Sequence, residues 1–338
     1  MKIKIDGQFF NAFTEARVSF ILGSVASEFS FSARFNPDNL FHRKVFKPLS
    51  YLPVEIYSNK NVLLLTGTII NVDLGSDSFR KLQVISGYSK SGVLEDCSIP
   101  LESYPLERIN VSLTELARSL IKSFDLTFSA SSNIAREMSQ VYLKTVASPS
   151  ETVKTFLSKL ASQRNIILGH TAQGNLNFFK LDTKKSSKFF FNQENTLSMS
   201  LSANGQSFFS KISVIRQPSS SKNVSLVDTV SNPLVGSKTR TLVKVLSSGT
   251  ETDTKKAADS ILASQLQNLS ITAKFERIID AIPGDIVEIE NPELHIYTRT
   301  KFVVSRHIIS EKEASENSEV TLVLPESFTG ETPKNIFE

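Results

Sequence analysis

The chain has 338 residues, of which 40% are hydrophobic and 21% are charged, a globular composition with enough length for two to four modest domains. Lys and Arg total 38 against 34 Asp and Glu, and the resulting net charge of +4 is scattered, which argues against a dedicated nucleic-acid-binding protein. No run of about 18 apolar residues occurs, so we expect neither a membrane-spanning segment nor a signal peptide. The single cysteine, Cys97, excludes an internal disulfide and fits a reducing compartment.

The first hundred residues are expected to be all β. Apolar and polar residues alternate with a period of two in several short segments, as in half-buried strands. These segments are Lys2–Asp6, Val18–Leu22, Phe29–Phe35, Val54–Tyr57, Leu64–Ile70 and Leu82–Ile85. Hairpin turns are expected at Asn59–Asn61 and at Gly75–Asp77, because Asn, Asp and Gly tolerate positive φ. About six short antiparallel strands predict a small barrel or sandwich.

Two amphipathic helices are expected next. Ser112 and Glu115 form a capping box at the start of the first helix, which ends near Phe124. The second has Ser148 as its expected N-cap and Pro149 at its first position, and it ends near Asn165. The following segment predicts a hairpin packed on this helix, with its turn at Gln173–Asn175.

The last third of the chain is expected to be mostly β. A strand is expected at Phe208–Ile215, a break at Ser219–Ser221 and a further strand at Thr239–Val245. A third helix is expected from about Asp253 to Asn268. Strands then continue to about Leu324.

Two parts of the chain resemble each other. Phe29–Phe35 is similar to Leu269–Phe275, and Pro53–Ile56 is similar to Pro283–Ile289. A strand pair and a closing strand follow in each part, so the order of the strands agrees as well as the letters. The sequence therefore predicts two copies of one small β-barrel, with helical material between them.

Residues suited to catalysis or metal binding are scattered. None of His42, His170, His295 and His307 has a second ligand at zinc-site spacing. The acid pairs Glu95–Asp96 and Glu288 with Glu290 are expected to be structural, because strand neighbours point to opposite faces and acids on an edge face solvent.

Three further features carry little chemistry. Cys97, a lone thiol beside two acids, is expected to be a small buried packing residue. Lys184, Lys185 and Lys188 read as a solvated turn, and the nucleotide-binding and nucleophile-elbow motifs are absent from the sequence. We therefore expect no catalytic residue, no metal site and no cofactor.

One segment, Ile85–Ser98, carries a distinctive motif. Eight of its residues form the pattern: Ser89, Lys90, Ser91, Gly92, Leu94, Asp96, Cys97 and Ser98. The segment resembles the signature that closes the first barrel of Mu-type baseplate hub proteins, the late control protein D or tail hub family. It departs from that signature at Tyr88, where the family has Arg, at Val93, where it has Asp, and at Glu95, where it has Val.

The resemblance implies a fold and a function. The fold is mainly β with α+β insertions, with two similar small antiparallel β-barrels plus helix-containing domains. The function is that of a structural baseplate hub in the virion tail of a contractile-tail phage, assembled in the host bacterial cytoplasm. A homotrimer would form a ring that joins the six-fold tail tube to the three-fold central spike, with a lumen for genome passage. Its partners would be the spike protein, tube or tube-initiator proteins, baseplate wedge proteins and, transiently, the passing DNA.

Combined with the repeat, the resemblance predicts a division into domains. The expected parts are 1–100 as the first barrel, 101–190 as an α+β middle domain, 191–217 with 270–328 as a discontinuous second barrel, 218–269 as an inserted α+β domain, and 329–338 as a flexible tail. Two alternatives remain open. One is the hub or spike head of a type VI secretion system or a phage-tail-like bacteriocin, and the other is a tail-associated glycan hydrolase.

Overall fold

The computed structural model describes residues 1–76, 82–216, 226–236, 238–246, 254–312 and 315–337. Three sequence predictions, at Asp77, Ser219–Ser221 and Asp253, therefore lie outside the described residues. The chain divides into two compact units. Unit 1 comprises Met1–Lys180, Glu276–Ile278 and Ile308–Ser318, and unit 2 comprises Leu181–Phe275, Ile279–His307 and Glu319–Glu338.

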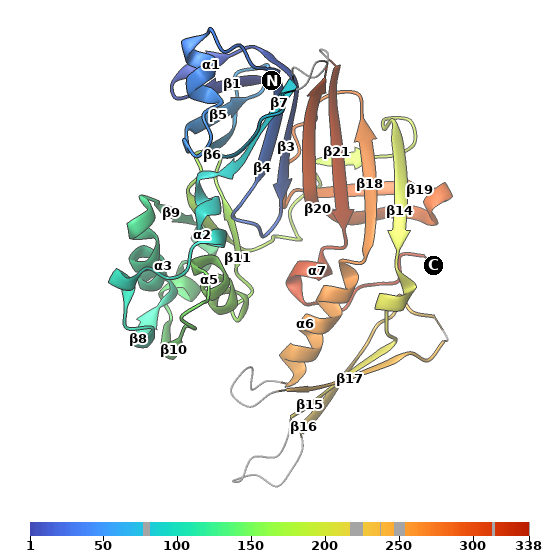
Figure 1. The fold of residues 1–338 in the computed structure, drawn as a ribbon. Helices are drawn as coiled ribbons and strands as arrows, with labels where there is room; N and C mark the ends of the chain where they lie inside the picture. The colour runs from blue at the N-terminus through green and yellow to red at the C-terminus, as the bar shows by residue number, and fades with distance from the viewer. Residues whose placement is uncertain (77–81, 217–225, 237, 247–253, 313–314, 338) are drawn as a thin grey trace. The chain divides into compact units, whose positions relative to one another are not determined.

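Unit 1 begins with an antiparallel barrel, called barrel 1 below. Its strands are β1 (Lys2–Ile5), β2 (Gln8–Phe10), β3 (Phe13–Ile21), β4 (Glu28–Arg34), β5 (Pro53–Tyr57), β6 (Leu63–Asp73) and β7 (Leu82–Ser89). They lie in the order β3-β4-β7-β6-β5-β1-β2, with every pair antiparallel (Figure 1). The expectation of about six short strands is confirmed.

Alternation along β4 shows why these residues form a barrel. Phe29, Phe31 and Ala33 are buried, while Ser30 and Ser32 between them are partly exposed. Burying a phenylalanine side chain stabilises the fold by about 1.5–3 kcal/mol, so this period fixes which face of the strand points inward.

A late segment completes this core. Ile309, from the part of strand β20 (Ile296–Lys312) that belongs to unit 1, is buried in the cluster formed by the barrel 1 strands. The Met1 ammonium pairs with Glu311 and donates a hydrogen bond to Asn59 Oδ1 at 2.7 Å. Residues about 300 positions apart in the sequence therefore build one core.

The expectation of an all-β first hundred residues is wrong in two places. Helix α1 (Leu40–Val45) begins at Asn39, whose side-chain oxygen accepts hydrogen bonds from the amides of Phe41 and His42, and it buries Val45 beneath the barrel. The second place is the 3₁₀ turn η1 (Lys90–Gly92) with helix α2 (Val93–Asp96).

The rest of unit 1 is an α+β domain. Its elements are β8 (Glu107–Ser112), α3 (Leu113–Ile121), β9 (Phe128–Ala130), α4 (Ala135–Ser139), β10 (Val141–Val146), α5 (Val153–Ser162), β11 (Ile167–His170) and β12 (Leu176–Phe179). Strands β8 and β10 form a two-stranded sheet, and β11-β12-β9 form another. The buried faces of α3 and α5 share one apolar core with Phe178.

The two predicted helix starts have different outcomes. The capping box is confirmed, since Ser112 Oγ accepts from the Glu115 amide at 3.2 Å and Glu115 Oε2 accepts from the Ser112 amide at 2.8 Å. The N-cap of α5 is Thr152 and not Ser148, because Thr152 Oγ1 accepts from the Thr155 amide. Ser148 lies in the turn before it, where its carbonyl accepts from the Glu151 amide.

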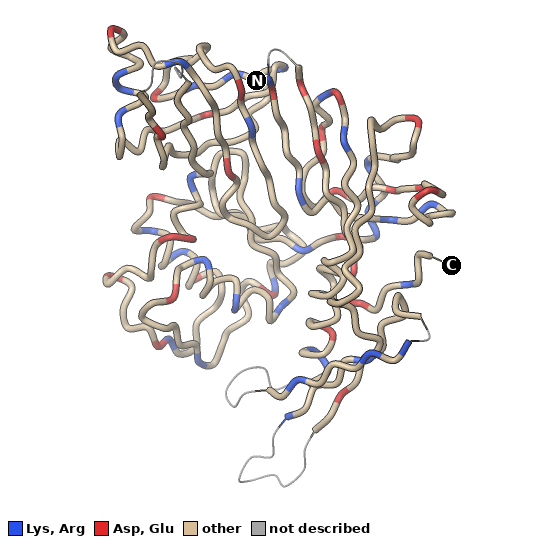
Figure 2. The backbone as a smooth tube through the Cα atoms, turned by 45° about the vertical axis from the view of Figure 1, so that its right-hand side comes forward, with Lys and Arg blue, Asp and Glu red and all other residues tan. Residues whose placement is uncertain are grey.

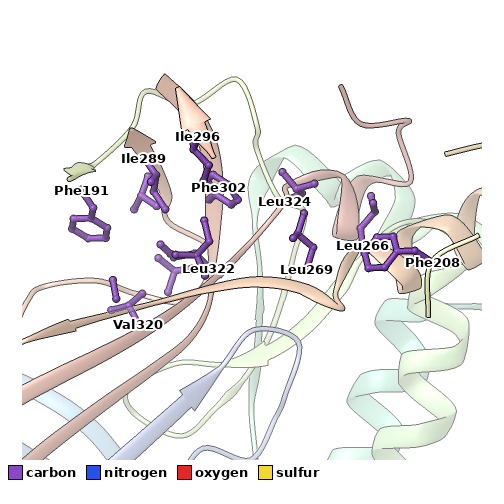
Figure 3. Close-up of a cluster of buried hydrophobic side chains, with 14 of the residues drawn as sticks. Phe191, Phe208, Leu266, Leu269, Ile289, Ile296, Phe302, Val320, Leu322 and Leu324 are labelled. Carbon is purple, nitrogen blue, oxygen red and sulfur yellow. The ribbon is translucent and has the colours of Figure 1, made fainter. Parts of the chain in front are cut away.

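Unit 2 contains barrel 2. Its strands are β13 (Phe189–Phe191), β14 (Ser198–Ala203), β18 (Leu269–Phe275), β19 (Ile286–Asn291), β20 and β21 (Ser315–Val323), and helix α7 (Glu326–Thr329) follows them. They lie in the order β14-β18-β21-β20-β19-β13. Figure 3 shows the buried side chains that fill its interior, including Phe191, Ile289 and Phe302.

The strand order of the two barrels agrees. The sequence β4-β7-β6-β5 in barrel 1 recurs as β18-β21-β20-β19 in barrel 2, and β3 and β14 lie antiparallel to β4 and β18. One pair differs, because β1 is antiparallel to β5 whereas β13 is parallel to β19. The predicted fold of two similar barrels with α+β insertions is confirmed.

An insertion separates β14 from β18. Strands β15 (Lys211–Arg216), β16 (Leu226–Ser231) and β17 (Thr241–Leu246) form the sheet β16-β15-β17, which packs against helix α6 (Thr254–Leu266) (Figure 1). The sequence analysis placed 211–216 in the second barrel, but β15 pairs only with insertion strands among the pairings of the described residues. Its alternating pattern predicted a strand correctly but could not name its neighbours.

The C-terminal residues pack on unit 2. Pro333 is buried, and Ile336 and Phe337 contact the barrel 2 core, where the sequence had suggested a flexible tail. Among the described residues, no helix has the length and apolarity needed to cross a membrane. The other predicted domain boundaries remain predictions.

Candidate functional site

The motif residues form a connector between barrel 1 and the α+β domain of unit 1. The segment leaves β7 at Ser89, passes through η1 and α2, and ends at Ser98, which forms an isolated β-bridge with Thr152. The carbonyl of Cys97 accepts a hydrogen bond from the Val153 amide at 3.1 Å. The end of the motif is thus attached to the first turn of α5.

Two buried serines hold this connector against the loop after β3. Ser89 Oγ and Ser91 Oγ both donate to the carbonyl oxygen of Val25, at 2.8 and 2.6 Å, and both serines are fully buried. The Ser89 amide donates to the Ser27 carbonyl at 2.8 Å, and the Ser27 amide donates to Ser89 Oγ at 3.1 Å. Burial of these polar atoms is tolerated because each has a partner.

His170 joins the same network from β11. Its Nδ1 lies 2.8 Å from the Thr171 carbonyl, and its Nε2 lies 2.6 Å from Ser27 Oγ. A carbonyl only accepts, so Nδ1 carries the proton and Nε2 of the neutral ring accepts from the Ser27 hydroxyl. Burial lowers the pKa of His170, which favours this neutral form. Ser27 is only 1% exposed, so the pair acts as a structural contact between the two domains.

Close packing explains two glycines. A Cβ on Gly92 would lie 2.6 Å from Cγ of Tyr88, whose hydroxyl donates to Asp96 Oδ2 at 2.7 Å. Gly174 has φ of +78°, and a Cβ there would lie 2.6 Å from Cβ of Lys90. Lys90 Nζ in turn donates to the Asp125 carbonyl at 2.7 Å. Burial and the Asp96 hydrogen bond raise the pKa of Tyr88, so its hydroxyl stays protonated and donates.

The remaining motif residues anchor α2. Leu94 is fully buried in the core of the α+β domain. Its neighbour Glu95 lies 3.5 Å from Lys154 Nζ and accepts from Ser24 Oγ at 3.2 Å. Cys97 is only partly buried, which corrects the expectation of a buried packing residue, because the short helix ends there and its side chain reaches the surface.

The other chemically interesting residues lie apart. Glu288 and Glu290 are partly exposed on β19, with Glu290 3.6 Å from Arg299. Lys188 lies in the ordered start of unit 2, 3.0 Å from Asp285, which departs from the expected solvated turn. No cluster of three or more potential metal ligands occurs in the described part of the chain.

A surface hollow beside α4 is lined by Arg136, Glu137, Ser139 and Gln140. The Glu137 carboxylate is paired with Lys180 at 2.9 Å, and this pairing lowers the pKa of Glu137. The arrangement is that of a neutralised surface acid, and it offers no nucleophile with an adjacent base.

Sequence reasoning identified the motif but missed its partners. Val25, Ser27 and His170 complete the network from positions up to about 80 residues away along the chain. The predicted turn at Gln173–Asn175 was the one local signal nearby, because it places Gly174 against Lys90.

Comparison with known proteins places the motif in a family context. Residues 91–180 match the family model described as "Baseplate hub protein gp44-like, second domain". The predicted resemblance to baseplate hub proteins is confirmed. That match begins at Ser91 inside the motif and ends at Lys180, the last residue of the continuous part of unit 1. No curated protein sequence matches the chain.

Solved structures share the fold over nearly the whole chain. The 43 kDa tail protein of prophage MuSo2 from Shewanella oneidensis has a TM-score of 0.79 at 17% identity, covering 97% of this chain and 99% of its own. The tail protein from Neisseria meningitidis MC58 has a TM-score of 0.77 at 16% identity, covering 97% of each chain. The E. coli c3393 protein, a component of the type VI secretion system, has a TM-score of 0.57 at 11% identity and covers 99% of this chain and 80% of its own. The double-barrel fold is therefore that of phage tail proteins.

The motif network makes a stability prediction. Replacing Ser91 with alanine removes one of the two hydroxyls that satisfy the buried Val25 carbonyl, so we expect unit 1 to lose about 1–3 kcal/mol of unfolding free energy. Ser98→Ala is the matched control, because Ser98 belongs to the same motif but is exposed. Urea unfolding of both variants measures the difference, and equal stabilities would show that the Ser91 hydroxyl is not structural.

Proposed function

We propose that this chain is the structural hub of a contractile phage tail and acts as a homotrimer without catalytic activity. The observation that carries the proposal is a duplicated barrel in one chain with a gp44-like hub domain between the copies. Three copies with two matched barrels each supply six barrels, so a closed ring of them can present near six-fold symmetry to a tube and three-fold symmetry to a spike.

The duplication separates two kinds of surface. Features shared by both barrels occur six times in the ring and suit six-fold partners, namely the tail tube and whatever passes along the axis. Features of one barrel alone, such as the α+β domain after barrel 1 or the β15–β17 insertion, occur three times and suit the spike and other three-fold partners. Function then follows from fixed geometry and large interfaces, and the chain works in the virion baseplate.

A second candidate is the hub or spike head of a type VI secretion system. The likeness to E. coli c3393, whose structure is described as similar to the phage tail proteins gp27 and gp5, favours it. The higher TM-scores of the two phage-type tail proteins favour the tail hub over it. Binding to purified tail tube protein or to secretion tube protein distinguishes the two candidates.

Solution mass tests the hub proposal directly. We expect light scattering to give three times the 37.5 kDa chain mass and negative-stain images to show a ring with a central hole. A protein that stays monomeric at high micromolar concentration contradicts the proposal. Turnover on purified peptidoglycan would instead revive an enzymatic role.

A further inference from the structure

The two barrels share more than their strand order. When β4 and β18 are aligned by the internal repeat, the buried positions match as apolar residues, and the outward positions match as well. The outward residues are Ser30, Ser32 and Arg34 on β4, and Ser270, Thr272 and Lys274 on β18. We call these two sets the matched faces. Hydroxyl, hydroxyl and cation occur in the same order in both.

The neighbouring strands extend each matched face with small polar groups. In barrel 2, Ser270 lies opposite Ser202, Thr272 opposite Ser200 and Lys274 opposite Ser198 on the edge strand β14. In barrel 1, Ser30 lies between Arg17 on β3 and Ser86 on β7. Core packing explains the repeated apolar positions, but nothing in either core requires the repeated outward residues.

The matched faces carry charge that nearly cancels. Arg34 and Arg17 in barrel 1 are accompanied by Glu15 and Glu28 on the same strands. In barrel 2 Lys274 lies 3.7 Å from Glu319. Figure 2 shows the same interspersed pattern of basic and acidic residues along the barrel strands. Each face therefore offers hydroxyl donors and acceptors with little net charge.

We propose that the matched faces form the wall of a central channel and contact the phosphate backbone of duplex DNA as it passes. This inference rests on the proposed trimeric ring, since only features shared by both barrels act around the axis with six-fold symmetry. Hydroxyl, Arg and Lys groups are ordinary donors to phosphate oxygens. Each phosphate that a cation neutralises adds affinity, so a hydroxyl-rich wall with balanced charge supports passage and avoids capture.

Adding charge to the wall tests the assignment. The double variant Ser32→Lys with Thr272→Lys places two lysines in each chain and six in the trimer, all on the matched faces. The control, Ser231→Lys with Thr241→Lys, adds the same charge at exposed positions on the outer face of the insertion sheet. Both variants change exposed or partly exposed polar residues on strands, so they carry similar folding costs.

The measurement is the salt dependence of binding to a linear duplex, added to the assembled protein. If six lysines reach one duplex, the slope of log affinity against log salt steepens by about 5, at about 0.9 per phosphate contact, and the control steepens it far less. A covalently closed circle of the same sequence cannot thread a preformed ring. The gain of the wall variant is therefore expected with the linear duplex and not with the circle.

The outcomes separate this inference from the hub proposal. Equal slopes in two trimeric variants, or an equal gain with closed circles, overturn the channel wall while leaving the hub intact. A wall variant that dissociates, beside a trimeric control, shows that the matched faces are buried between copies or against a tube subunit, and this also overturns it. A monomeric wild type overturns both proposals.

Discussion

Replacing Gly87 with alanine is expected to cost barrel 1 about 3 kcal/mol or more, because overpacking against backbone cannot relax cheaply. Gly87 lies in β7 between Phe29 of β4 and Ile69 of β6. A Cβ there would lie 2.7 Å from Cζ of Phe29 and 2.9 Å from the carbonyl carbon of Thr68. Both neighbours belong to paired strands, so a shift breaks either the ladder or the core.

Gly75→Ala is the matched control for this change. Gly75 follows β6 in the same barrel, and a Cβ there meets no atom within 4 Å. Urea unfolding and soluble yield should fall sharply for Gly87→Ala and stay close to wild type for Gly75→Ala. A Gly87→Ala protein within about 0.5 kcal/mol of wild type would mean that strands β6 and β7 lie further apart than described.

Acidification is expected to destabilise unit 2 through His307. This residue of β20 is only 1% exposed, and its Nδ1 lies 2.8 Å from the Ala281 carbonyl. Burial lowers the pKa of His307 to about 4, although Asp280 and Asp285 nearby act in the opposite direction and Lys188 with burial. The neutral ring therefore belongs to the native state.

The direction of the effect follows from proton binding. Between pH about 6.5 and about 4 the unfolded chain protonates this histidine while the folded chain does not, so the unfolded state gains protons and stability falls with pH. The full contribution is present above pH about 6.5, and its loss by pH about 4 amounts to about 3 kcal/mol.

Comparing variants isolates this contribution from that of the carboxylates. His307→Gln should unfold with a shallower loss of stability between pH 7 and pH 4 than wild type, whatever its stability at neutral pH. His295→Asn is the control, since His295 is exposed and its positive φ suits asparagine. Parallel pH profiles for His307→Gln and wild type would show that His307 is already protonated in the native protein.

Local patterns predicted much of this fold. The alternation in Phe29–Phe35 predicted β4, and the capping box of Ser112 and Glu115 predicted the start of α3, because each signal lies within a few residues of its effect. The N-cap of α5 was misplaced because Ser148 and Thr152 are both good caps, and the choice depends on the long-range bridge from Ser98 to Thr152.

The candidate site was predictable only in part. The motif Ser89–Ser98 is contiguous and could be recognised, but its function as a connector depends on Val25, Ser27 and His170. Those contacts are set by the packing of separate elements, which a single sequence does not encode in any local period. Helix α1 was missed for a related reason, since its apolar positions are few and it is fixed by contacts with the barrel core.

The late segment that completes barrel 1 has a consequence for the order of folding. Ile309 and Glu311 belong to the core and surface of unit 1, yet they are synthesised after almost all of unit 2. A ribosome that has released the first hundred residues has released a barrel still lacking one of its pieces. The nascent N-terminal strands therefore keep apolar surface open until translation is nearly finished, which makes them a natural substrate for chaperones and gives the chain a built-in delay before it can assemble.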